Sequence, residues 1–255
     1  MRKTIFTNVA LAAALAVFHV APARAEFATR TLPYDDDGMS FEAYAVWNPD
    51  LFDTRGIVYI LPDWTGLDGY ERTRAQMLAA EGYTAVALDL YGTEAHPQGF
   101  EDYRRLSSSL LGDRAALRQR VLAGLGVALD LPGAHRGAAM IGYCFGGTAA
   151  MEAALAGAPM EGFALFHGGL RGYDTQDFSV IGGEVMIYQG SADPATSMSD
   201  LAVLVDRLRD AEVIHGLRVY GGVRHAFTVW GGRDYDGNAE ADSWRSLVDF
   251  LDRLF

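Results

Sequence analysis

The stretch Met140-Ile141-Gly142-Tyr143-Cys144-Phe145-Gly146-Gly147-Thr148 decides how this chain folds. An apolar run ends in a Gly-x-Cys-x-Gly-Gly turn, and a run of small, helix-forming residues follows it. Strand, sharp turn and helix in this order predict a nucleophile elbow, in which the residue at the tip is lifted out of the turn. Gly142 and Gly146 flank Cys144 where any side chain would collide as the strand and the helix approach each other. We therefore expect Cys144 to project above a sheet, at a helix N-terminus that favours its thiolate.

The pattern around the elbow predicts a single α/β domain over residues 26–255. The chain has 255 residues, of which half are hydrophobic, and this is enough for one large core. Continuous apolar runs at 56–61 and 84–88 enclose a helical pattern at 69–81, which is typical of a parallel βαβ unit. Phe41 to Trp47 alternates and predicts a half-exposed edge strand. Other predicted strands cover 162–166, 184–190 and 214–220, and predicted helices cover 100–131, with a break near 112, and 240–254.

The first 25 residues differ from the rest of the chain. Arg2 and Lys3 precede an apolar run from Val9 to Val20, and Ala23-Arg24-Ala25 follows. This is the pattern of a secretory signal peptide, and its apolar run is too short to span a bilayer. We expect cleavage near Ala25, export to the periplasm or the medium, and no stable membrane insertion afterwards.

The charge of the chain excludes several kinds of partner and chemistry. The net charge is -12, and it would become -15 without residues 1–25, which include three basic residues and no acid. Nucleic acid is therefore not expected as a partner. Lys3 is the only lysine, so the exported protein would have none. Schiff-base chemistry and a P-loop lysine are thereby excluded.

Cys144 is the only cysteine in the sequence. Exported proteins normally use cysteines in pairs as disulfides, so an unpaired thiol suggests a chemical role. The alternative is an inert buried cysteine that packs like a small hydrophobic residue. Packing alone would not require glycines on both sides of the thiol, which favours a nucleophile.

Three residues at the ends of three predicted strands form a candidate catalytic triad. Cys144, Asp193 and His225 follow separate strands, and catalytic groups gather at the carboxyl ends of parallel strands. Their order along the chain, nucleophile, acid and histidine, is that of the α/β-hydrolase triad. In this chemistry the thiol attacks an acyl carbon, the histidine transfers the proton, and the acid orients the imidazole.

Other residues compete for these roles. His135 and His215 fall near the amino ends of strands, and His96 follows no triad position. His167 follows a strand, and we expect it to line the substrate pocket, with a plain loop histidine as the alternative. Three further aspartates lie in loops and are alternatives to Asp193 as the acid: Asp174, Asp177 and Asp236.

An acyl-transfer intermediate also needs two backbone donors for its oxyanion. The N–H of Phe145, directly after the nucleophile, is one candidate. Trp64, in the loop after the 56–61 strand, is the other. Asp63 and Trp64 have a structural alternative, in which the aspartate starts a turn and the indole packs over it.

With these residues in view, the chain resembles the dienelactone hydrolase family of α/β hydrolases over nearly its whole length after residue 25. The resemblance is carried by the elbow and by three further motifs: Asp89-Leu90-Tyr91, Gly190-Ser191-Ala192-Asp193 and Arg224-His225-Ala226-Phe227. It implies an α/β-hydrolase fold, with a mostly parallel central sheet and helices on both faces. It also implies an esterase or lactonase that works through a cysteinyl thioester without a cofactor or metal ion.

The chain departs from the family in two ways. Members often have a glutamate where Asp63 stands, so the activation of the thiol is in question. Members that act on dienelactone have arginines for its carboxylate, at places held here by Gly92 and Thr93 and by Thr228 and Val229. We therefore expect the substrate to be a small-molecule ester or lactone other than dienelactone. An uncharged or larger ester fits better, with the following residues at the pocket: Asp63, Trp64, Tyr143, His167 and Trp230.

Two other functional classes remain open from the sequence. A thiolate at a helix N-terminus is oxidisable, so the chain is also compatible with a peroxide-reacting thiol protein, although no second cysteine is present to resolve it. A non-catalytic ligand-binding relative is the third possibility, since fold alone does not give function. For the assembly we expect a monomer or a homodimer.

Overall fold

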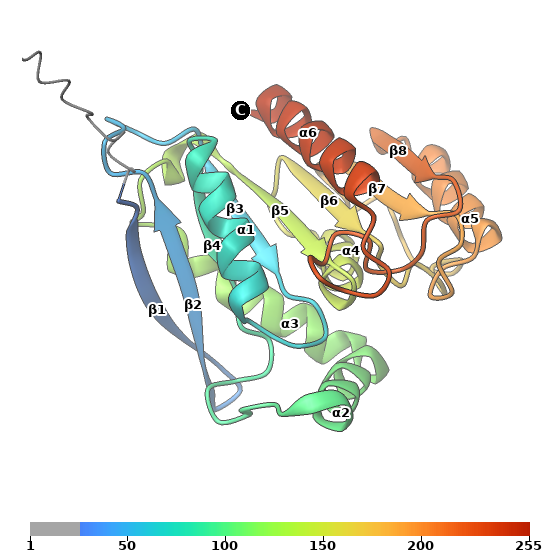
Figure 1. The fold of residues 1–255 in the computed structure, drawn as a ribbon, viewed down its shortest axis with the longest axis horizontal. Helices are drawn as coiled ribbons and strands as arrows, with labels where there is room; N and C mark the ends of the chain where they lie inside the picture. The colour runs from blue at the N-terminus through green and yellow to red at the C-terminus, as the bar shows by residue number, and fades with distance from the viewer. Residues whose placement is uncertain (1–25) are drawn as a thin grey trace, which may run out of the picture.

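Eight strands form one sheet that runs through the middle of the molecule (Figure 1). The structure, a computed structural model, describes residues 26–255, so the expected signal peptide lies outside the described residues. The strand order is β1-β2-β4-β3-β5-β6-β7-β8. The pairs from β4 to β8 are all parallel, whereas β1 pairs with β2, and β2 with β4, in antiparallel fashion. The predicted α/β fold with a mostly parallel sheet is confirmed.

Five of the strands that follow the first hairpin, β3 to β7, are short and have no exposed residue because helices cover both faces of the sheet. β8, at the edge, has half of its residues exposed. The strands are β1 (Ala28–Asp36), β2 (Met39–Trp47), β3 (Ile57–Leu61), β4 (Thr84–Ala87), β5 (Ala138–Tyr143), β6 (Gly162–Phe166), β7 (Glu184–Gly190) and β8 (His215–Tyr220).

Helices pack on the two faces of the sheet and enclose two cores. α1 (Gly69–Ala80) and α6 (Gly237–Leu254) cover one face, with Leu78 and Phe250 in its core (Figure 1). The other face packs against α3 (Arg114–Gly124), α4 (Phe145–Leu155) and α5 (Met198–Asp210). The remaining helices are α2 (Gly99–Gly112) and the short 3-10 turns η1 (Leu125–Ala128) and η2 (Ala134–Arg136). Among residues 26–255, no helix has the length and apolar character needed to cross a bilayer.

The structure corrects one prediction about the edge of the sheet. β2 covers the predicted Phe41–Trp47 strand but is not at the edge, because β1 pairs along its whole length. β1 carries mostly exposed polar residues and Pro33, which sheets accept mainly in edge strands. Such a strand lacks the apolar alternation from which strands are predicted, so no sequence pattern indicated it.

The sheet order places the candidate residues. β5, which leads to Cys144, lies between β3 and β6, so the loops after these two strands flank the cysteine. The loops that contain Asp193 and His225 follow β7 and β8, on the side of β6. All five strands are parallel, and their carboxyl ends therefore share one rim.

Candidate active site

Cys144 forms the tip of a sharp turn between β5 and α4. It has φ 55° and ψ −113°, a conformation that residues with a side chain rarely adopt. A Cβ atom on Gly142 would lie 2.0 Å from the carbonyl oxygen of Gly146, and one on Gly146 would lie 2.1 Å from that of Leu61. Both glycines are therefore required for the close approach of β5, β3 and α4. The half-buried thiol lies at the start of α4, as the sequence predicts.

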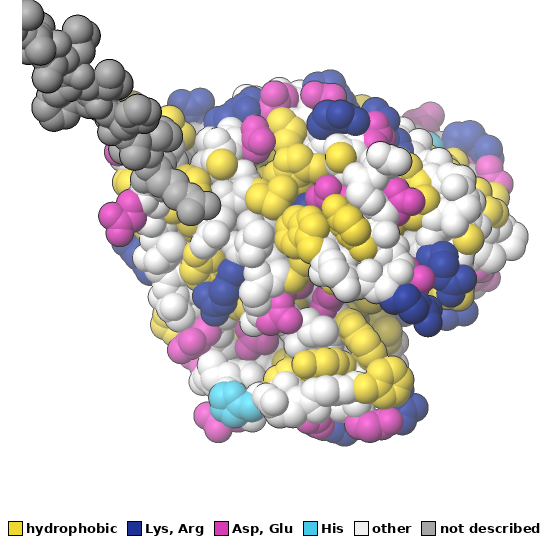
Figure 2. Space-filling view, viewed as in Figure 1, with side chains coloured by type: hydrophobic (Ala, Val, Ile, Leu, Met, Phe, Trp, Pro, Cys, Tyr) yellow, Lys and Arg dark blue, Asp and Glu magenta, His cyan; other side chains and the backbone are white. Residues whose placement is uncertain are grey.

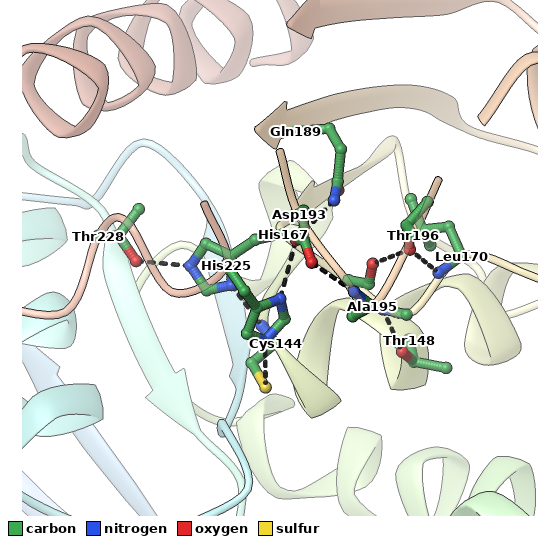
Figure 3. A network of polar contacts seen from close by, with 12 residues as sticks. Cys144, Thr148, His167, Leu170, Gln189, Asp193, Ala195, Thr196, His225 and Thr228 are labelled. Atoms are coloured by element: carbon green, nitrogen blue, oxygen red, sulfur yellow. Dashed lines mark hydrogen bonds and ion pairs between the residues drawn. The ribbon is translucent and has the colours of Figure 1, made fainter. Parts of the chain in front are cut away.

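The structure brings Cys144, His225 and Asp193 into one hydrogen-bonded row (Figure 3). His225 Nε2 lies 3.1 Å from Cys144 Sγ, and Nδ1 lies 2.8 Å from Asp193 Oδ2. The Asp193 side chain is fully buried and also accepts hydrogen bonds from Gln189 Nε2 and the backbone N–H of Ala195, each at 2.7 Å. These two donors hold the carboxylate in place, and the fixed carboxylate in turn orients the imidazole of His225.

His225 carries its charge over a wide pH range. Burial of the ring opposes protonation, but the hydrogen bonds and charges of Asp193 and Cys144 outweigh it and raise the pKa of His225 to about 10. A protonated imidazole next to sulfur is the arrangement that keeps a cysteine nucleophilic.

The alternative acids lie elsewhere. Asp236 caps α6, where its side chain accepts the N–H groups of Asn238 and Ala239. Asp177 accepts hydrogen bonds from Ser179 and lies on the surface. Asp193 is thus the carboxylate that contacts His225.

Two backbone N–H groups near the thiol are free to bind a ligand. Within residues 26–255, neither Trp64 nor Phe145 donates its N–H to any protein acceptor. The Trp64 loop is held rigidly: the Tyr91 hydroxyl donates to the Trp64 carbonyl at 2.9 Å, and Asp63 Oδ1 accepts from the backbone N–H of Thr65 at 2.7 Å. Such fixed donors suit a developing oxyanion.

Asp63 does two things in this loop. It forms the expected turn, and it also lines the cavity beside Cys144. Burial raises the pKa of Asp63 although the hydrogen bonds from Thr65 favour its ionised form. Behind it, the buried Glu71 accepts the backbone N–H groups of Asp63 and Asp68, each at 3.1 Å, and so ties the loop to α1.

A cavity of about 540 Å³ opens in front of the thiol. Its wall is mostly apolar, and α2 closes one side with Ser107 and Leu111. Figure 2 shows hydrophobic side chains gathered on the surface over this helix. The residues that line the cavity are Asp63, Trp64, Thr65, Ser107, Leu111, Cys144, Phe145, Thr148, Gly169, Arg171, Ala195, His225, Ala226 and Val229. A small apolar ester has room here.

Three residues expected at the pocket do not line it. Tyr143 alternates with Cys144 along the chain, so its ring points to the opposite face of the sheet and stacks on Phe166, fully buried. Trp230 lies on that same side, with its ring 4.0 Å from the Arg74 guanidinium. His167 is fully buried behind the nucleophile. These expectations are corrected: alternation along β5 turns the Tyr143 side chain away from that of Cys144, and for His167 and Trp230 sequence position does not show to which side of a loop a side chain points.

Some residues of the site were missed by the sequence analysis. Gln189 is a polar residue directly after the apolar run 185–188 of β7, and this exception was a signal that it has a specific partner, Asp193. Ser107 and Leu111 gave no signal, since nothing in a helical pattern shows which cavity the helix covers. Within residues 26–255, no group of three or more His, Cys, Asp or Glu residues is arranged to hold a metal ion.

Comparison with known proteins agrees with this geometry. The model of the dienelactone hydrolase family matches residues 41–255. A Synechocystis protein named "Putative carboxymethylenebutenolidase" is 25% identical over 206 residues, which are 75% of this chain and 83% of that protein. A dienelactone hydrolase-like promiscuous phosphotriesterase from metagenomic libraries is 30% identical, with a TM-score of 0.81, over 90% of this chain and 99% of that one. The structure named m3DLH is also 30% identical, with a TM-score of 0.83 and the same coverage.

Proposed function

This chain belongs to the dienelactone hydrolase family and is a hydrolase of the ester and lactone type, and we propose that it works through a thioester on Cys144. The observation that carries the proposal is the row of contacts from Cys144 Sγ to His225 Nε2 at 3.1 Å and from His225 Nδ1 to Asp193 at 2.8 Å. Nucleophile, base and orienting acid have the geometry that covalent acyl transfer requires.

In the first half of the reaction the ester acylates the cysteine. The Cys144 thiolate attacks the carbonyl carbon, and the oxygen takes up the negative charge between the N–H groups of Trp64 and Phe145. The tetrahedral intermediate collapses, the carbon–oxygen bond to the leaving group breaks, and His225 Nε2 gives its proton to the departing alkoxide. The products are an alcohol, a thioester and a neutral His225.

In the second half water releases the acid. The neutral His225 takes a proton from a water molecule, and the resulting hydroxide attacks the thioester carbon. The second tetrahedral intermediate expels the Cys144 thiolate and leaves a carboxylic acid, while His225 keeps the proton. Asp193 stays ionised throughout and stabilises the charged imidazole at both ends of the cycle.

The substrate that we propose is a small ester or lactone with an apolar acyl group, other than dienelactone. Most of the cavity wall is apolar, including Trp64, Leu111 and Val229. Thr228, at a place where members that act on dienelactone have an arginine, is buried and contacts His167 instead of the cavity. An apolar acyl chain would gain free energy from burial against these walls.

We also propose that the enzyme is exported, on the strength of the signal-peptide pattern in residues 1–25. The full-length gene would be expressed in a bacterial host, and the periplasmic fraction and medium collected. The expected result is a protein that begins at Glu26, found outside the cytoplasm. A full-length cytoplasmic protein would contradict this proposal.

The catalytic proposal is tested on the purified enzyme with p-nitrophenyl acetate, p-nitrophenyl butyrate, a panel of lactones and a phosphotriester, the last because a related protein is named for that activity. We expect ester turnover that iodoacetamide stops by labelling Cys144. Intact-mass spectrometry of the quenched reaction should show the acyl group on the enzyme. Normal turnover by Cys144→Ala would falsify the mechanism. Rapid consumption of peroxide without esterase activity would favour a thiol redox protein instead.

A further inference from the structure

The contacts of His167 determine where its proton lies. The ring is fully buried, and each nitrogen has a partner (Figure 3). Nδ1 lies 3.1 Å from the backbone nitrogen of Cys144, and Nε2 lies 2.8 Å from the hydroxyl oxygen of Thr228. A backbone N–H can only donate, so Nδ1 must accept, and the single proton of the ring lies on Nε2. His167 is therefore a neutral imidazole that donates to Thr228.

The surroundings of His167 keep it neutral. Burial lowers the pKa of His167 well below its ordinary value, and the positive charges of His225 and Arg74 lower it further. The two histidine rings meet edge to face, with centroids 5.2 Å apart. The other titratable side chains on this side are Tyr70, whose hydroxyl lies 2.7 Å from that of Thr228, and Tyr143. None of these groups favours a second positive charge beside His225.

The hydrogen bond to Nδ1 acts on Cys144, whose backbone conformation is strained. A residue with φ 55° and ψ −113° persists only where its surroundings hold it. On one side of Cys144, its N–H is shared between His167 Nδ1 and the Phe166 carbonyl, which lies 3.0 Å away. On the other side, its carbonyl accepts the N–H groups of Gly147 at 3.0 Å and Thr148 at 3.3 Å.

Two peptide groups are thus fixed on either side of one Cα atom. Their orientation sets the direction of the Cys144 side chain, and hence the distance from Sγ to His225. It also sets the direction of the Phe145 N–H, which belongs to the second of these peptide groups. A change at His167 would therefore reach both the thiol and a donor of the oxyanion site.

We propose that His167 is a positioning residue, which holds the peptide group of Cys144 through Nδ1 so that the thiol meets His225 and the Phe145 N–H meets the oxyanion. Its kinetic consequence rests on the proposed function. This role explains why a buried histidine follows β6 without reaching the substrate cavity.

Two variants separate the acceptor from the bulk of the ring. His167→Asn places an amide oxygen near the position of Nδ1 and can still accept from Cys144. His167→Phe keeps a ring of similar size and cannot accept. Rates are divided by the fraction of folded protein, measured by circular dichroism before each assay, so that unfolded protein is not counted. We expect kcat of His167→Phe to fall about 100-fold with KM nearly unchanged, and that of His167→Asn to fall about tenfold or less.

A control variant removes a buried hydrogen bond from the neighbouring strand. The Tyr188 hydroxyl donates to Ser246 at 3.2 Å, on the opposite face of the sheet from the cavity, so Tyr188→Phe loses a bond without touching Cys144. We expect its kcat to stay within about threefold of the wild type. Wild-type kcat in folded His167→Phe would overturn the proposal. So would equal losses in His167→Asn and His167→Phe, since these would indicate a merely structural role.

A measurement without an ester distinguishes this proposal from the proposed function. The rate of Cys144 alkylation by iodoacetamide at neutral pH should fall about tenfold in His167→Phe, which is the effect of about one hydrogen bond, and much less in His167→Asn. If the wild type cleaves no ester but alkylation follows this order, the function is wrong and the positioning role stands. Equal alkylation in all variants, with wild-type ester turnover intact, would overturn the positioning role alone.

Discussion

At the scale of single residues, the two histidines of the site differ in charge: His225 is protonated and His167 is neutral. Their hydrogen-bond partners explain the difference. His225 lies between an ionised aspartate and the sulfur, which favour the imidazolium. His167 lies between a backbone N–H and a hydroxyl, and one of these can only donate. The same side chain is therefore a proton carrier at one position and a fixed acceptor 58 residues earlier in the chain. Amino-acid type alone could not have distinguished these roles.

The charge of His225 makes stability depend on pH. The pKa of His225 is about 10 in the folded protein, whereas an unfolded imidazole has a pKa of about 6.5. Between these values the folded state holds a proton that the unfolded state lacks, so the stabilisation is complete below about pH 6.5 and is lost as the pH rises through about 10. We expect the difference in Tm between wild type and His225→Gln to be largest near pH 6 and to shrink towards about pH 10.5.

Differential scanning calorimetry at several pH values measures this difference. A difference that grows with rising pH would contradict the assignment of the charge. The comparison with His225→Gln cancels the contributions of ionisable groups that lie far from residue 225, which both proteins share.

At the scale of elements, the elbow depends on how closely three backbones approach. Cys144, Gly142 and Gly146 could be predicted from the sequence because a Gly-x-Cys-x-Gly-Gly turn between a strand and a helix has few other uses. The positions of Asp193 and His225 followed from strand ends, which a parallel sheet brings to one rim. Strand ends do not show in which direction a side chain points. Tyr143 and Trp230 were therefore expected at the pocket, whereas both lie on the opposite face of the sheet.

A pair of glycine substitutions tests the elbow. A Cβ atom on Gly146 would lie 2.1 Å from the carbonyl oxygen of Leu61, and backbone cannot yield as a flexible side chain does. We expect Gly146→Ala to lower the free energy of unfolding by more than about 3 kcal/mol. Gly69, at the start of α1, meets nothing within 4 Å, so Gly69→Ala should raise it by about 0.4–1 kcal/mol.

Denaturant unfolding followed by circular dichroism gives both values. Equal effects of the two substitutions would show that the close approach at Gly146 is not needed for the fold. Gly69→Ala also controls for the general effect of adding a methyl group to a helical glycine.

At the scale of the whole molecule, one buried arginine connects α1 and α6 to the loop after β8, which contains His225 and Thr228. Arg74 on α1 lies 2.9 Å from Glu240 on α6 and donates to the Thr228 carbonyl at 2.9 Å. Aromatic rings surround its guanidinium, with Trp230 the nearest. Trp230, expected at the substrate pocket, thus belongs to this cluster. No sequence pattern joins residues 74, 228 and 240, because their contact exists only in the folded chain.

Loss of this arginine should be costly. Arg74→Met would leave the Glu240 carboxylate without its partner, and breaking a buried pair from one side costs about 3–5 kcal/mol. Arg105→Met removes an exposed pair with Asp102 and should cost less than about 1 kcal/mol. Urea unfolding of both variants measures the two costs, and similar values would show that Arg74 is not a structural centre. Because Arg74 also holds Thr228, Arg74→Met should lower ester turnover as well.

The outer position of β8 has a consequence for how the enzyme fails. Half of its residues are exposed, β7 is the only strand of residues 26–255 that pairs with it, and the loop after it carries His225. An edge strand of this kind unfolds locally before the core does, because few apolar contacts hold it. Ester turnover should therefore disappear at a lower urea concentration than helical circular dichroism, and amide hydrogens of residues 215–225 should exchange sooner than those of β5. Cys144 would then keep its position in a folded core after the loop with His225 has unfolded. Inactivation by low concentrations of urea should therefore be reversible on dilution.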